Sequence, residues 1–461
     1  MAKCWNDFLR RLEKNQGQVL RVGESLDPNG YETGAYIKLL EGKGKSPVVI
    51  FEDVKNLQGE PSSFKLVHNV FATRSLCAMA IGEPASNDQM GLSVRFGELQ
   101  EKPGPCEIIE RNEAPVLQNV WLGAQADVTR LPAARYHEKD AGPYFVMACL
   151  IKSRSGEFYN VTMTKNMVHG PQRLSISAHG VHHLARMIAE YEAAGEPTPV
   201  AVVLGHHPAF YLGSCALTPY GNRDYETISA YMGEPLRLVS SASLGDDFLV
   251  PADAEIIIEG FIPPGVREPQ NPFGEISGHY QNRMMAPVID VKAICFRENA
   301  VMEAISPSRA EHFNLGSVPK EGSVFNSIKR VVPEVTAVYL PHSGCGRFSC
   351  YISLIKHTFR DVQAAAMIAF TEVMNLKLVV VVDDEIDVFN EKEVMWAVTT
   401  QTRWDKDVTV IPRVQSFRSW LGDAVCIIDA THPEDVADFP ERNKIPAEVE
   451  KKIAGMFNKK P

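Results

Sequence analysis

The acidic residue Glu275 follows a Pro-Phe-Gly turn, residues 272–274, shortly after an apolar, strand-like run at 250–260. Proline and glycine fix the backbone of a turn, so a turn of this kind can hold a carboxyl group rigidly at the mouth of a sheet. A rigidly held carboxyl group is suited to proton transfer. Because acids in loops are more often solvated than catalytic, the rest of the chain must supply the context for Glu275.

The middle of the chain is rich in histidine, which suggests a metal site. The histidines there are His169, His179, His182, His183, His206 and His207. Neighbouring side chains on a helix point in different directions, so His182 and His183 cannot both bind one ion. One imidazole with the amide oxygen of Asn160 and the carboxylate of Asp224 would suit manganese or magnesium, not a thiolate-rich zinc site. Ordinary structural histidines are the alternative.

A second group of acids, residues 383–387, follows the aliphatic run 376–382. Acids at the carboxyl end of a parallel strand can bind a cation, although solvated loop carboxylates are the commoner outcome. Neither a Gly-x-Gly-x-x-Gly motif nor a P-loop motif is present in the sequence. The sequence therefore does not indicate a classical dinucleotide fold or a P-loop phosphate site.

Length and composition limit the classes of protein. A chain of 461 residues is too long for one compact core and predicts two or three domains. A net charge of −10 argues against a nucleic-acid partner. Nine cysteines without a Cys-x-x-Cys pair indicate reduced thiols and a cytoplasmic location. The first 16 residues are typical of an amphipathic helix, and the longest aliphatic run, 378–382, is too short to span a membrane.

Three regions follow from the order of strand and helix patterns, with predicted bounds 1–115, 116–318 and 319–461. The middle region is β-rich, because apolar runs at 144–151, 199–204, 254–258 and 288–295 are separated by Gly, Pro and Asn. Its clearest helix is 181–194, before Gly195 and Pro197. The last region is α/β, with strands at 335–340, 350–355 and 376–382, a helix at 361–374 and a charged terminal helix at 445–460. The run 376–382 is apolar on both faces, which is typical of a buried parallel strand.

Taken in order, six motifs resemble the UbiD-type decarboxylases, which use prenylated FMN (prFMN). They are Asn160 with Lys165, Gly180 to Leu184, Gly205 to Pro208, Asp224-Tyr225, Pro272 to Glu275, and 382–387 with 394–397. The resemblance extends over most of the chain. It implies an α/β (α+β) fold in which a central split β-barrel binds the flavin, between an N-terminal α/β region and a C-terminal α/β oligomerisation domain.

The resemblance also implies a ligand set. Asn160, His183 and Asp224 would hold Mn2+ (or Mg2+) against the cofactor phosphate, and K+ would lie beside the backbone of residues 214–216. The cofactor-binding residues implied are Asn160, Val161, Thr162, Met163, Lys165, His182, His183, Ser214, Cys215, Ala216 and Asp224. A hard cation held by oxygen atoms and one imidazole is chemically suited to neutralise a phosphate.

In the family the cofactor acts as an electron sink and an acid in the position of Glu275 protonates carbon. This chain departs from the family pattern at three positions: Lys165 replaces an Arg, Gln270 replaces a Glu, and Asp224 replaces a Glu. A Lys–Gln pair keeps one positive charge but loses the bidentate fork and one carboxylate. Glu268 is a candidate to replace that carboxylate, and His312 is a candidate partner for a substrate hydroxyl.

The favoured activity is reversible, non-oxidative decarboxylation of a hydroxylated or heteroaromatic acid, since a ring hydroxyl can itself activate the ring carbon. The Lys–Gln change and the segment 345–348 favour this branch over α,β-unsaturated (cinnamic-type) acids. From other classes, a metal-dependent hydrolase and a non-catalytic flavin-binding protein are the alternatives. The expected partners are a small carboxylic acid, CO2, a flavin prenyltransferase that supplies the cofactor, and further copies of the chain in a homodimer or homohexamer.

Overall fold

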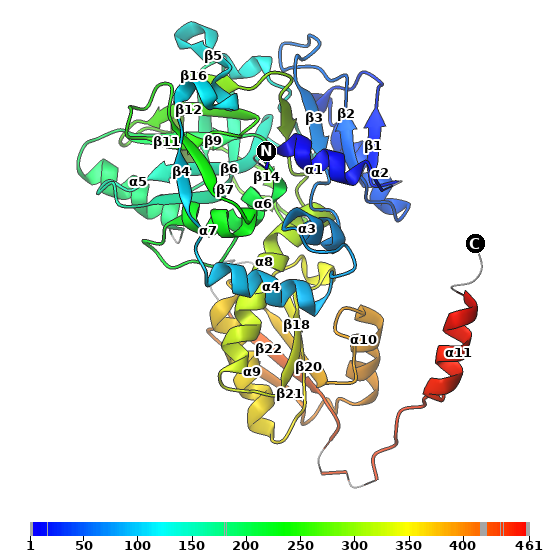
Figure 1. The fold of residues 1–461 in the computed structure, drawn as a ribbon. Helices are drawn as coiled ribbons and strands as arrows, with labels where there is room; N and C mark the ends of the chain where they lie inside the picture. Colours follow the sequence, from blue (N-terminus) through cyan, green and yellow to red (C-terminus); the bar gives the residue numbers. More distant parts are fainter. Residues whose placement is uncertain are drawn as a thin grey trace.

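The computed structural model describes residues 3–15, 17–178, 180, 182–414, 422–433, 435, 436 and 438–457. His179 and Val181 of the predicted motifs lie outside these residues. Helices and strands are mixed. A closed barrel and an N-terminal sheet lie side by side, and a C-terminal sheet lies below them in the view of Figure 1. This confirms the predicted α/β (α+β) fold with a central barrel. Within the described residues, no helix has the length and apolar character needed to cross a membrane.

The N-terminal sheet has the strand order β1-β2-β3-β17. Its elements are β1 (Val19–Val22), β2 (Val48–Phe51), β3 (Lys65–His68) and β17 (Val301–Glu303), with helices α1 (Trp5–Leu12), α2 (Glu32–Gly42), α3 (Arg74–Ala80) and α4 (Met90–Gln100). Helix α1 buries Trp5, Phe8 and Leu12, as the amphipathic pattern predicts. Strand β17 joins this sheet from far along the chain, so the N-terminal region and the end of the barrel are tied together.

The barrel is a ring of six strands in the order β12-β9-β6-β7-β8-β16, closed by pairing of β12 with β16. They are β6 (Tyr144–Lys152), β7 (Tyr159–Gly170), β8 (Arg173–Ile176), β9 (Thr198–Val203), β12 (Ile256–Ile262) and β16 (Met284–Phe296). The four predicted apolar runs are confirmed as β6, β9, β12 and β16. Strands β5 (Asn119–Leu122) and β13 (Arg267–Gln270) pair with β16 outside the ring. A small sheet beside the barrel contains β4 (Cys106–Ile108), β10 (Leu236–Ser240) and β11 (Leu249–Pro251).

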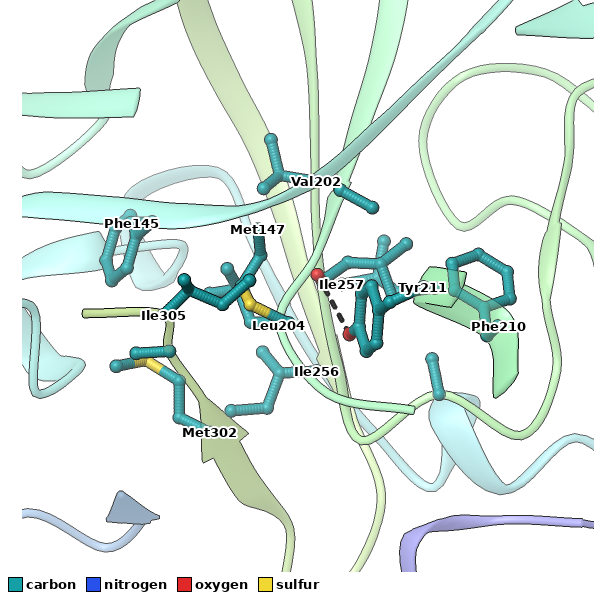
Figure 2. Packing of buried hydrophobic residues seen from close by; sticks show 14 of the residues in the cluster. Phe145, Met147, Val202, Leu204, Phe210, Tyr211, Ile256, Ile257, Met302 and Ile305 are labelled. Carbon is teal, nitrogen blue, oxygen red and sulfur yellow. Dashed lines mark hydrogen bonds between the residues drawn. The ribbon is translucent and has the colours of Figure 1, made fainter. Parts of the chain in front are cut away.

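Apolar side chains from the barrel strands and helix α6 (Pro208–Ser214) form one buried core (Figure 2). Met147 of β6, Ile256 of β12 and Tyr211 of α6 are all buried there. The Tyr211 hydroxyl donates to the carbonyl of Val203 at 3.3 Å and accepts from the amide of Gly205 at 2.7 Å. These bonds hold the predicted Gly205–Pro208 turn against the core, because a buried hydroxyl needs partners.

Helix α5 (His183–Ala193) confirms the predicted helix at 181–194, and α7 (Asp224–Met232) follows α6. The 20-residue helix α8 (Ala310–Lys329) has no counterpart in the prediction. Gly316, Pro319 and Gly322 lower its intrinsic helix propensity, so the helix must depend on packing. It packs on α4, where buried Glu321 accepts from the Ser93 hydroxyl at 2.7 Å. A Cβ at Gly322 would lie 2.0 Å from the Ser93 carbonyl oxygen, so glycine allows the close approach.

The C-terminal sheet has the order β18-β19-β20-β22-β21. Its elements are β18 (Val335–Tyr339), β19 (Ser349–Leu354), β20 (Leu378–Asp383), β21 (Val408–Ile411) and β22 (Val425–Ala430), with α9 (Phe359–Glu372) and α10 (Glu391–Thr400). Strand β20 is buried and parallel to both neighbours, as predicted. The terminal helix α11 (Ala447–Phe457) is also confirmed, and Figure 1 shows it (red) standing apart from the other elements.

Candidate active site

A cavity of about 360 Å³ lies where β7, α5, α7 and α8 meet. Ten residues predicted to bind the cofactor line it: Asn160, Val161, Thr162, Met163, His182, His183, Ser214, Cys215, Ala216 and Asp224. They come from the start of β7, the start of α5, the segment after α6 and the first residue of α7. The structure thus brings together residues that are up to 64 positions apart in the chain.

Asp224 and Asn160 form the polar end of this cavity. The Asp224 carboxylate accepts from the side-chain amide of Asn160 and the backbone amide of Val161, both at 2.9 Å. Its other oxygen accepts from Thr218 at 3.3 Å and Asn222 at 3.2 Å. Burial raises the pKa of Asp224, and these hydrogen bonds oppose that shift. The amide oxygen of Asn160 is buried and has no hydrogen-bond partner among the residues that the structure describes.

Two adjacent histidines stand at the start of α5, and both line the cavity. His183 is its first residue and packs edge-on against Tyr220 at 5.4 Å between ring centroids, whereas His182 is the exposed N-cap. Together with Asn160 and Asp224, His183 would offer one nitrogen and two oxygen atoms to a ligand. This is the donor set predicted for a manganese or magnesium ion.

The remaining histidines of the predicted cluster have structural surroundings. His169 lies 3.3 Å from a carboxylate oxygen of Glu268, His206 stacks on Phe210, and His207 packs against Phe8 of α1. Burial lowers the pKa of His206 to about 3. In the described part of the chain, no group of three or more His, Cys, Asp and Glu residues is arranged to hold a metal.

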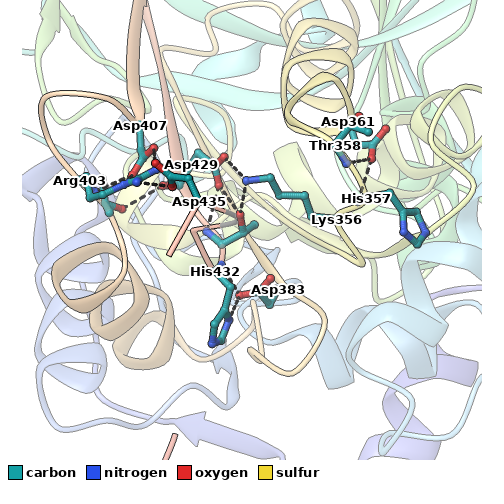
Figure 3. Close-up of polar contacts among 12 residues, drawn as sticks. Lys356, His357, Thr358, Asp361, Asp383, Arg403, Asp407, Asp429, His432 and Asp435 are labelled. Atoms are coloured by element: carbon teal, nitrogen blue, oxygen red, sulfur yellow. Dashed lines mark hydrogen bonds and ion pairs between the residues drawn. The ribbon is translucent and has the colours of Figure 1, made fainter. Parts of the chain in front are cut away.

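The acids after β20 are engaged within the C-terminal domain (Figure 3). Asp383 accepts from the backbone and the ring nitrogen of His432, each at 2.9 Å. Glu385 pairs with Lys444 at 2.7 Å, and Asp387 accepts from the backbone amide of Phe389 at 3.0 Å. Carboxylates with such partners form part of a loop and cap network.

Lys165 and Glu275 form a side-chain ion pair beside the cavity. Lys165 belongs to β7, five residues after Asn160, and also lies 5.3 Å from the centre of the Phe273 ring. Glu275 is only 5% exposed, so it is not a solvated loop acid. A buried carboxylate of this kind requires a cation or hydrogen-bond donors, and Lys165 provides the cation.

The turn before Glu275 is held from several sides. Strands β14 (Phe273–Gly274) and β15 (Tyr280–Gln281) pair across the Glu275 hairpin, defined here as residues 273–281. Phe273 packs on Tyr144 at 4.3 Å between ring centroids, and Asp140 accepts from the amide of Gly274 at 3.0 Å. The backbone carbonyl of Glu275 accepts from the hydroxyl of Ser308. The carboxyl group is therefore fixed by packing and by backbone hydrogen bonds, as rigid positioning requires.

The two residues predicted to replace the family carboxylate occupy different positions. Gln270 is fully buried and donates to the backbone carbonyl of Lys165 at 3.0 Å. Its own amide oxygen has no hydrogen-bond partner among the described residues. Glu268 contacts Arg173 at 2.9 Å and His169 at 3.3 Å. Gln270 thus touches the strand that carries Lys165, whereas Glu268 is engaged with a separate pair of basic side chains.

His312 lines the cavity from α8. The charges of four side chains act on its imidazole: Lys165, Glu275, Arg347 and Lys320. Burial lowers the pKa of His312 to about 3, with the charges of Arg347 and Lys165 acting in the same direction. Its Nδ1 accepts from the backbone amide of Ser308 at 3.4 Å. In this tautomer Nε2 carries the hydrogen of a neutral imidazole.

Lys320 and Arg347 also line the cavity. Lys320 was not selected from the sequence, and Arg347 was named there only as part of the segment 345–348, without a role in the site. Burial, and then Arg347, lower the pKa of Lys320 to about 7. Arg347 reaches the cavity because Gly316 of α8 has no side chain: a Cβ there would lie 2.4 Å from the Arg347 guanidinium. Gly346, at φ +67°, likewise lies against the Phe313 carbonyl oxygen, 2.6 Å from where a Cβ would stand. The only signal in the sequence is the spacing of His312, Leu315, Gly316 and Lys320, which places them on one helix face.

Family models match the chain in three consecutive segments. The 3-octaprenyl-4-hydroxybenzoate carboxy-lyase N-terminal domain matches residues 10–92, its Rift-related domain matches 107–310, and its C-terminal domain matches 313–419. The chain belongs to the UbiD family. It is a carboxy-lyase of that family, which confirms the resemblance seen in the motifs.

Curated relatives of this UbiD-family chain are decarboxylases. The anhydromevalonate phosphate decarboxylase of Methanosarcina mazei is 28% identical over 413 residues, covering 89% of this chain and 90% of that protein. The phenolic acid decarboxylase of Sedimentibacter hydroxybenzoicus is 28% identical over 480 residues, covering 96% of this chain and 95% of that protein.

Solved UbiD-class structures share the fold over the whole chain. An evolved dimeric form of HmfF from Pelotomaculum thermopropionicum, in complex with prFMN, is 33% identical with a TM-score of 0.88 and covers 99% of this chain and 100% of that one. The apo 3,4-dihydroxybenzoic acid decarboxylase AroY of Klebsiella pneumoniae is 25% identical with a TM-score of 0.87, covering 99% of each chain.

We expect His312 to make this UbiD-family protein less stable in acid. Its folded pKa of about 3 lies below the value of 6.5 expected for a histidine in the unfolded chain, so between these pH values the unfolded chain binds the extra proton and stability falls as pH falls. Between pH 7 and pH 5, protonation of His312 in the unfolded chain lowers the free energy of unfolding by about 2 kcal/mol. The variant His312→Asn should not show this loss.

The measurement is the free energy of urea unfolding at pH 7 and pH 5 for both proteins. The matched control is His357→Asn, because His357 is exposed on the surface and does not line the cavity. An equal loss of stability in the wild type and in His312→Asn would contradict the assignment of a buried, neutral His312.

Proposed function

We propose that this protein catalyses the reversible, non-oxidative decarboxylation of a hydroxylated or heteroaromatic carboxylic acid with prFMN as its cofactor. The observation that carries the proposal is the buried Lys165–Glu275 ion pair beside a cavity lined by Asn160, His183 and Asp224. An acid with its own cation, next to a cofactor-sized cavity, is the arrangement that protonation of carbon requires.

The residues of the cavity fit a phosphate-bearing cofactor with a divalent metal. The buried amide oxygen of Asn160 lacks a hydrogen-bond partner within the described part of the chain, and a buried acceptor of this kind favours a cation as its ligand. Asn160, His183 and Asp224 would hold Mn2+ or Mg2+, and the backbone of 214–216 would border K+. Lys320 adds positive charge to the same cavity, which suits the anionic groups of cofactor and substrate.

When bound, prFMN would supply an electron sink for the negative charge left behind as CO2 departs. The chain's own groups do the rest. The Lys165 ammonium attracts the substrate carboxylate, and as this contact replaces the ion pair, Glu275 binds a proton more readily. The Glu275 carboxyl group then delivers that proton to the carbon that lost CO2. In the carboxylation direction the Glu275 carboxylate removes the same proton, as microscopic reversibility requires.

His312 supports the proposed class of substrate. A neutral imidazole whose Nδ1 accepts from the Ser308 amide presents Nε2–H as a donor, and an oxygen on an aromatic ring is a suitable acceptor. Relatives named phenolic acid decarboxylase and gallate decarboxylase are consistent with this class. Turnover of a panel of hydroxybenzoic, furoic and cinnamic acids, measured as CO2 release, would test it.

An α,β-unsaturated acid is the second candidate substrate, because anhydromevalonate phosphate decarboxylases match most of the chain. Rapid turnover of cinnamic-type acids with no turnover of hydroxylated aromatic acids would favour this candidate. For a metal-dependent hydrolase we find little support, since His169, His206 and His207 lie outside the cavity and have separate partners. The Lys165–Glu275 ion pair argues against a purely flavin-binding role.

Helix α11 supports the proposal that the chain assembles as a homodimer or homohexamer. Val449, Ile453 and Met456 lie on one face of the helix and are 46%, 41% and 59% exposed. An apolar helical stripe of this kind is usually covered. A second copy of the chain would cover this stripe. Figure 1 shows that α11 stands apart from the other elements.

The metal assignment predicts a joint loss. His183→Ala should lose both the divalent metal and the flavin, because the ion would link the protein to the cofactor phosphate. Metal is measured by mass spectrometry and flavin by absorbance, on protein produced with a flavin prenyltransferase as cofactor supplier. His169→Ala, outside the cavity, is the control. A His183→Ala protein with full metal and flavin would show that His183 is not a ligand.

The proton-donor assignment predicts a loss of chemistry without a loss of binding. Glu275→Gln nearly preserves shape and should retain flavin, yet decarboxylation and solvent-deuterium exchange should fall by about two to four orders of magnitude. Product formation and exchange are followed by NMR in heavy water. Glu268→Gln is the matched variant: if that change abolishes exchange while Glu275→Gln does not, Glu268 is the donor.

The assembly proposal predicts a change in mass in solution. Val449→Glu combined with Ile453→Glu should shift the chain toward monomer, because buried charges at an apolar contact are costly. Lys451→Glu, elsewhere on the same exposed helix, is the control and should leave the mass unchanged. Molar mass is measured by light scattering after size exclusion. Identical masses for all three proteins would exclude α11 as an assembly contact.

A further inference from the structure

The wall that α8 forms along the catalytic cavity carries positive charge that the proposed proton transfer does not use. In that reaction Lys165 attracts the carboxylate that leaves, and Glu275 delivers the proton. Lys320 of α8 and Arg347 line the same cavity, and neither has a part in these steps. Two cations in a cavity for an acidic substrate therefore need an account of their own.

Lys320 and the next residue, Glu321, point to different sides of α8. The Glu321 carboxylate is fully buried and accepts from Arg74 at 2.8 Å and from Ser93 at 2.7 Å. Lys320 is half-buried and lines the cavity. Among the residues that the structure describes, no Asp or Glu lies within ion-pair distance of Lys320. The lysine thus offers its charge to the cavity.

Arg347 brings a second positive charge to the same part of the wall. His312, Gly316 and Lys320 are four residues apart, so they lie on one face of α8 at intervals of about 6 Å. The Arg347 guanidinium lies beside Gly316, in the space that a Cβ there would need. A helical side chain leans toward the helix N-terminus, so Lys320 reaches back toward Arg347. The charge of Arg347 lowers the pKa of Lys320, as two neighbouring cations require.

The loop that carries Arg347 is fixed to α8. Nε2 of His342 donates to the amide oxygen of Asn314 in α8 at 2.8 Å. The backbone amide of Arg347 donates to the carbonyl of Gly344 at 3.1 Å. Packing and hydrogen bonds thus hold the loop in place before any ligand binds, which is what a preorganised binding site needs.

The cation pair lies apart from the Lys165–Glu275 ion pair. The charges of Lys165 and Glu275 act on the pKa of His312, but neither acts on that of Lys320, two helical turns further along α8. Other parts of the lining are apolar, with Ile305, Leu315 and Met374 among them. The cavity therefore offers positive charge at two separate places and apolar surface for a flat ring.

We propose that Lys320 and Arg347 bind a second anionic group of the substrate. The substrate would then be an aromatic or heteroaromatic acid that carries a further carboxylate or a phosphate on its ring. This inference rests on the proposed function and narrows its substrate class. Lys165 holds the carboxylate that leaves as CO2, and the Lys320–Arg347 pair holds the group that stays.

Two matched pairs of acids test the proposal on the holoenzyme. Benzene-1,3-dicarboxylate is compared with its monomethyl ester, and 3-phosphonooxybenzoate is compared with 3-hydroxybenzoate. The dissociation constant is measured by calorimetry, and KM is measured for any acid that is turned over. The doubly charged member of at least one pair should bind about tenfold or more tightly than its partner, because it gains a hydrogen bond between charged groups. The pair with the larger ratio identifies the second group as carboxylate or phosphate.

Variants of Lys320 assign this gain to the lysine. Lys320→Met should remove about tenfold of the affinity for the doubly charged acid and leave the affinity for its partner within about twofold. Lys320→Arg keeps the charge and should keep the preference. Lys329→Met, at the exposed end of the same helix, is the matched control and should behave as the wild type.

Flavin content and thermal unfolding separate this role from cofactor binding and from folding. Lys320→Met removes a poorly solvated charge, so its unfolding midpoint should match or exceed that of the wild type. Loss of flavin from this variant, or equal affinities within both pairs in the wild type, would overturn the proposal. If no acid releases CO2, the proposed function fails while the dissociation constants still decide this inference. Turnover without any preference for a second charge would have the opposite meaning.

Discussion

Closure of the barrel by β16 is the constraint on which the rest of the structure depends. This strand pairs with β12 to close the ring, with β8 inside it, and with β5 and β13 outside it. The Glu275 hairpin joins β13 to β16. The register of β16 therefore sets the position of Glu275 along the barrel strands, and with it the contact with Lys165 of β7. An antiparallel register cannot slip by one residue without reversing every side chain, and this fixes the ion pair.

The cavity joins elements of very different sequence character. The barrel strand β7 carries Asn160 near its start and Lys165 in its middle, and short helices supply Asp224 and His183. Helix α8 supplies the facing wall with His312 and begins five residues after Ile305, which also lines the cavity. One side of the site is thus formed by barrel strands, whose positions are fixed by strand pairing. The other side is formed by α8, whose position depends on helix packing.

The sequence predicts the barrel well and the facing wall poorly, for a physical reason. Apolar runs such as 144–151 report burial directly, because a strand with both faces buried needs such a run. The motif around Glu275 could be recognised because its turn residues are local. Helix α8 was not predicted, since Gly316, Pro319 and Gly322 mask a helix that forms only on contact with α4. Arg347 was not selected because its approach to α8 depends on contacts between distant residues, and no local pattern records them.

The packing of α8 on α4 has a consequence for how the cavity can be altered. Ser93 lies in α4 and does not line the cavity, yet its backbone lies against Gly322 and its hydroxyl against Glu321. A helix with weak intrinsic propensity follows its support, because little in its own backbone resists a shift. Substitutions in α4 can therefore shift α8 and reposition His312 and Lys320. The substrate selectivity of this enzyme can thus be altered through residues that do not contact the substrate.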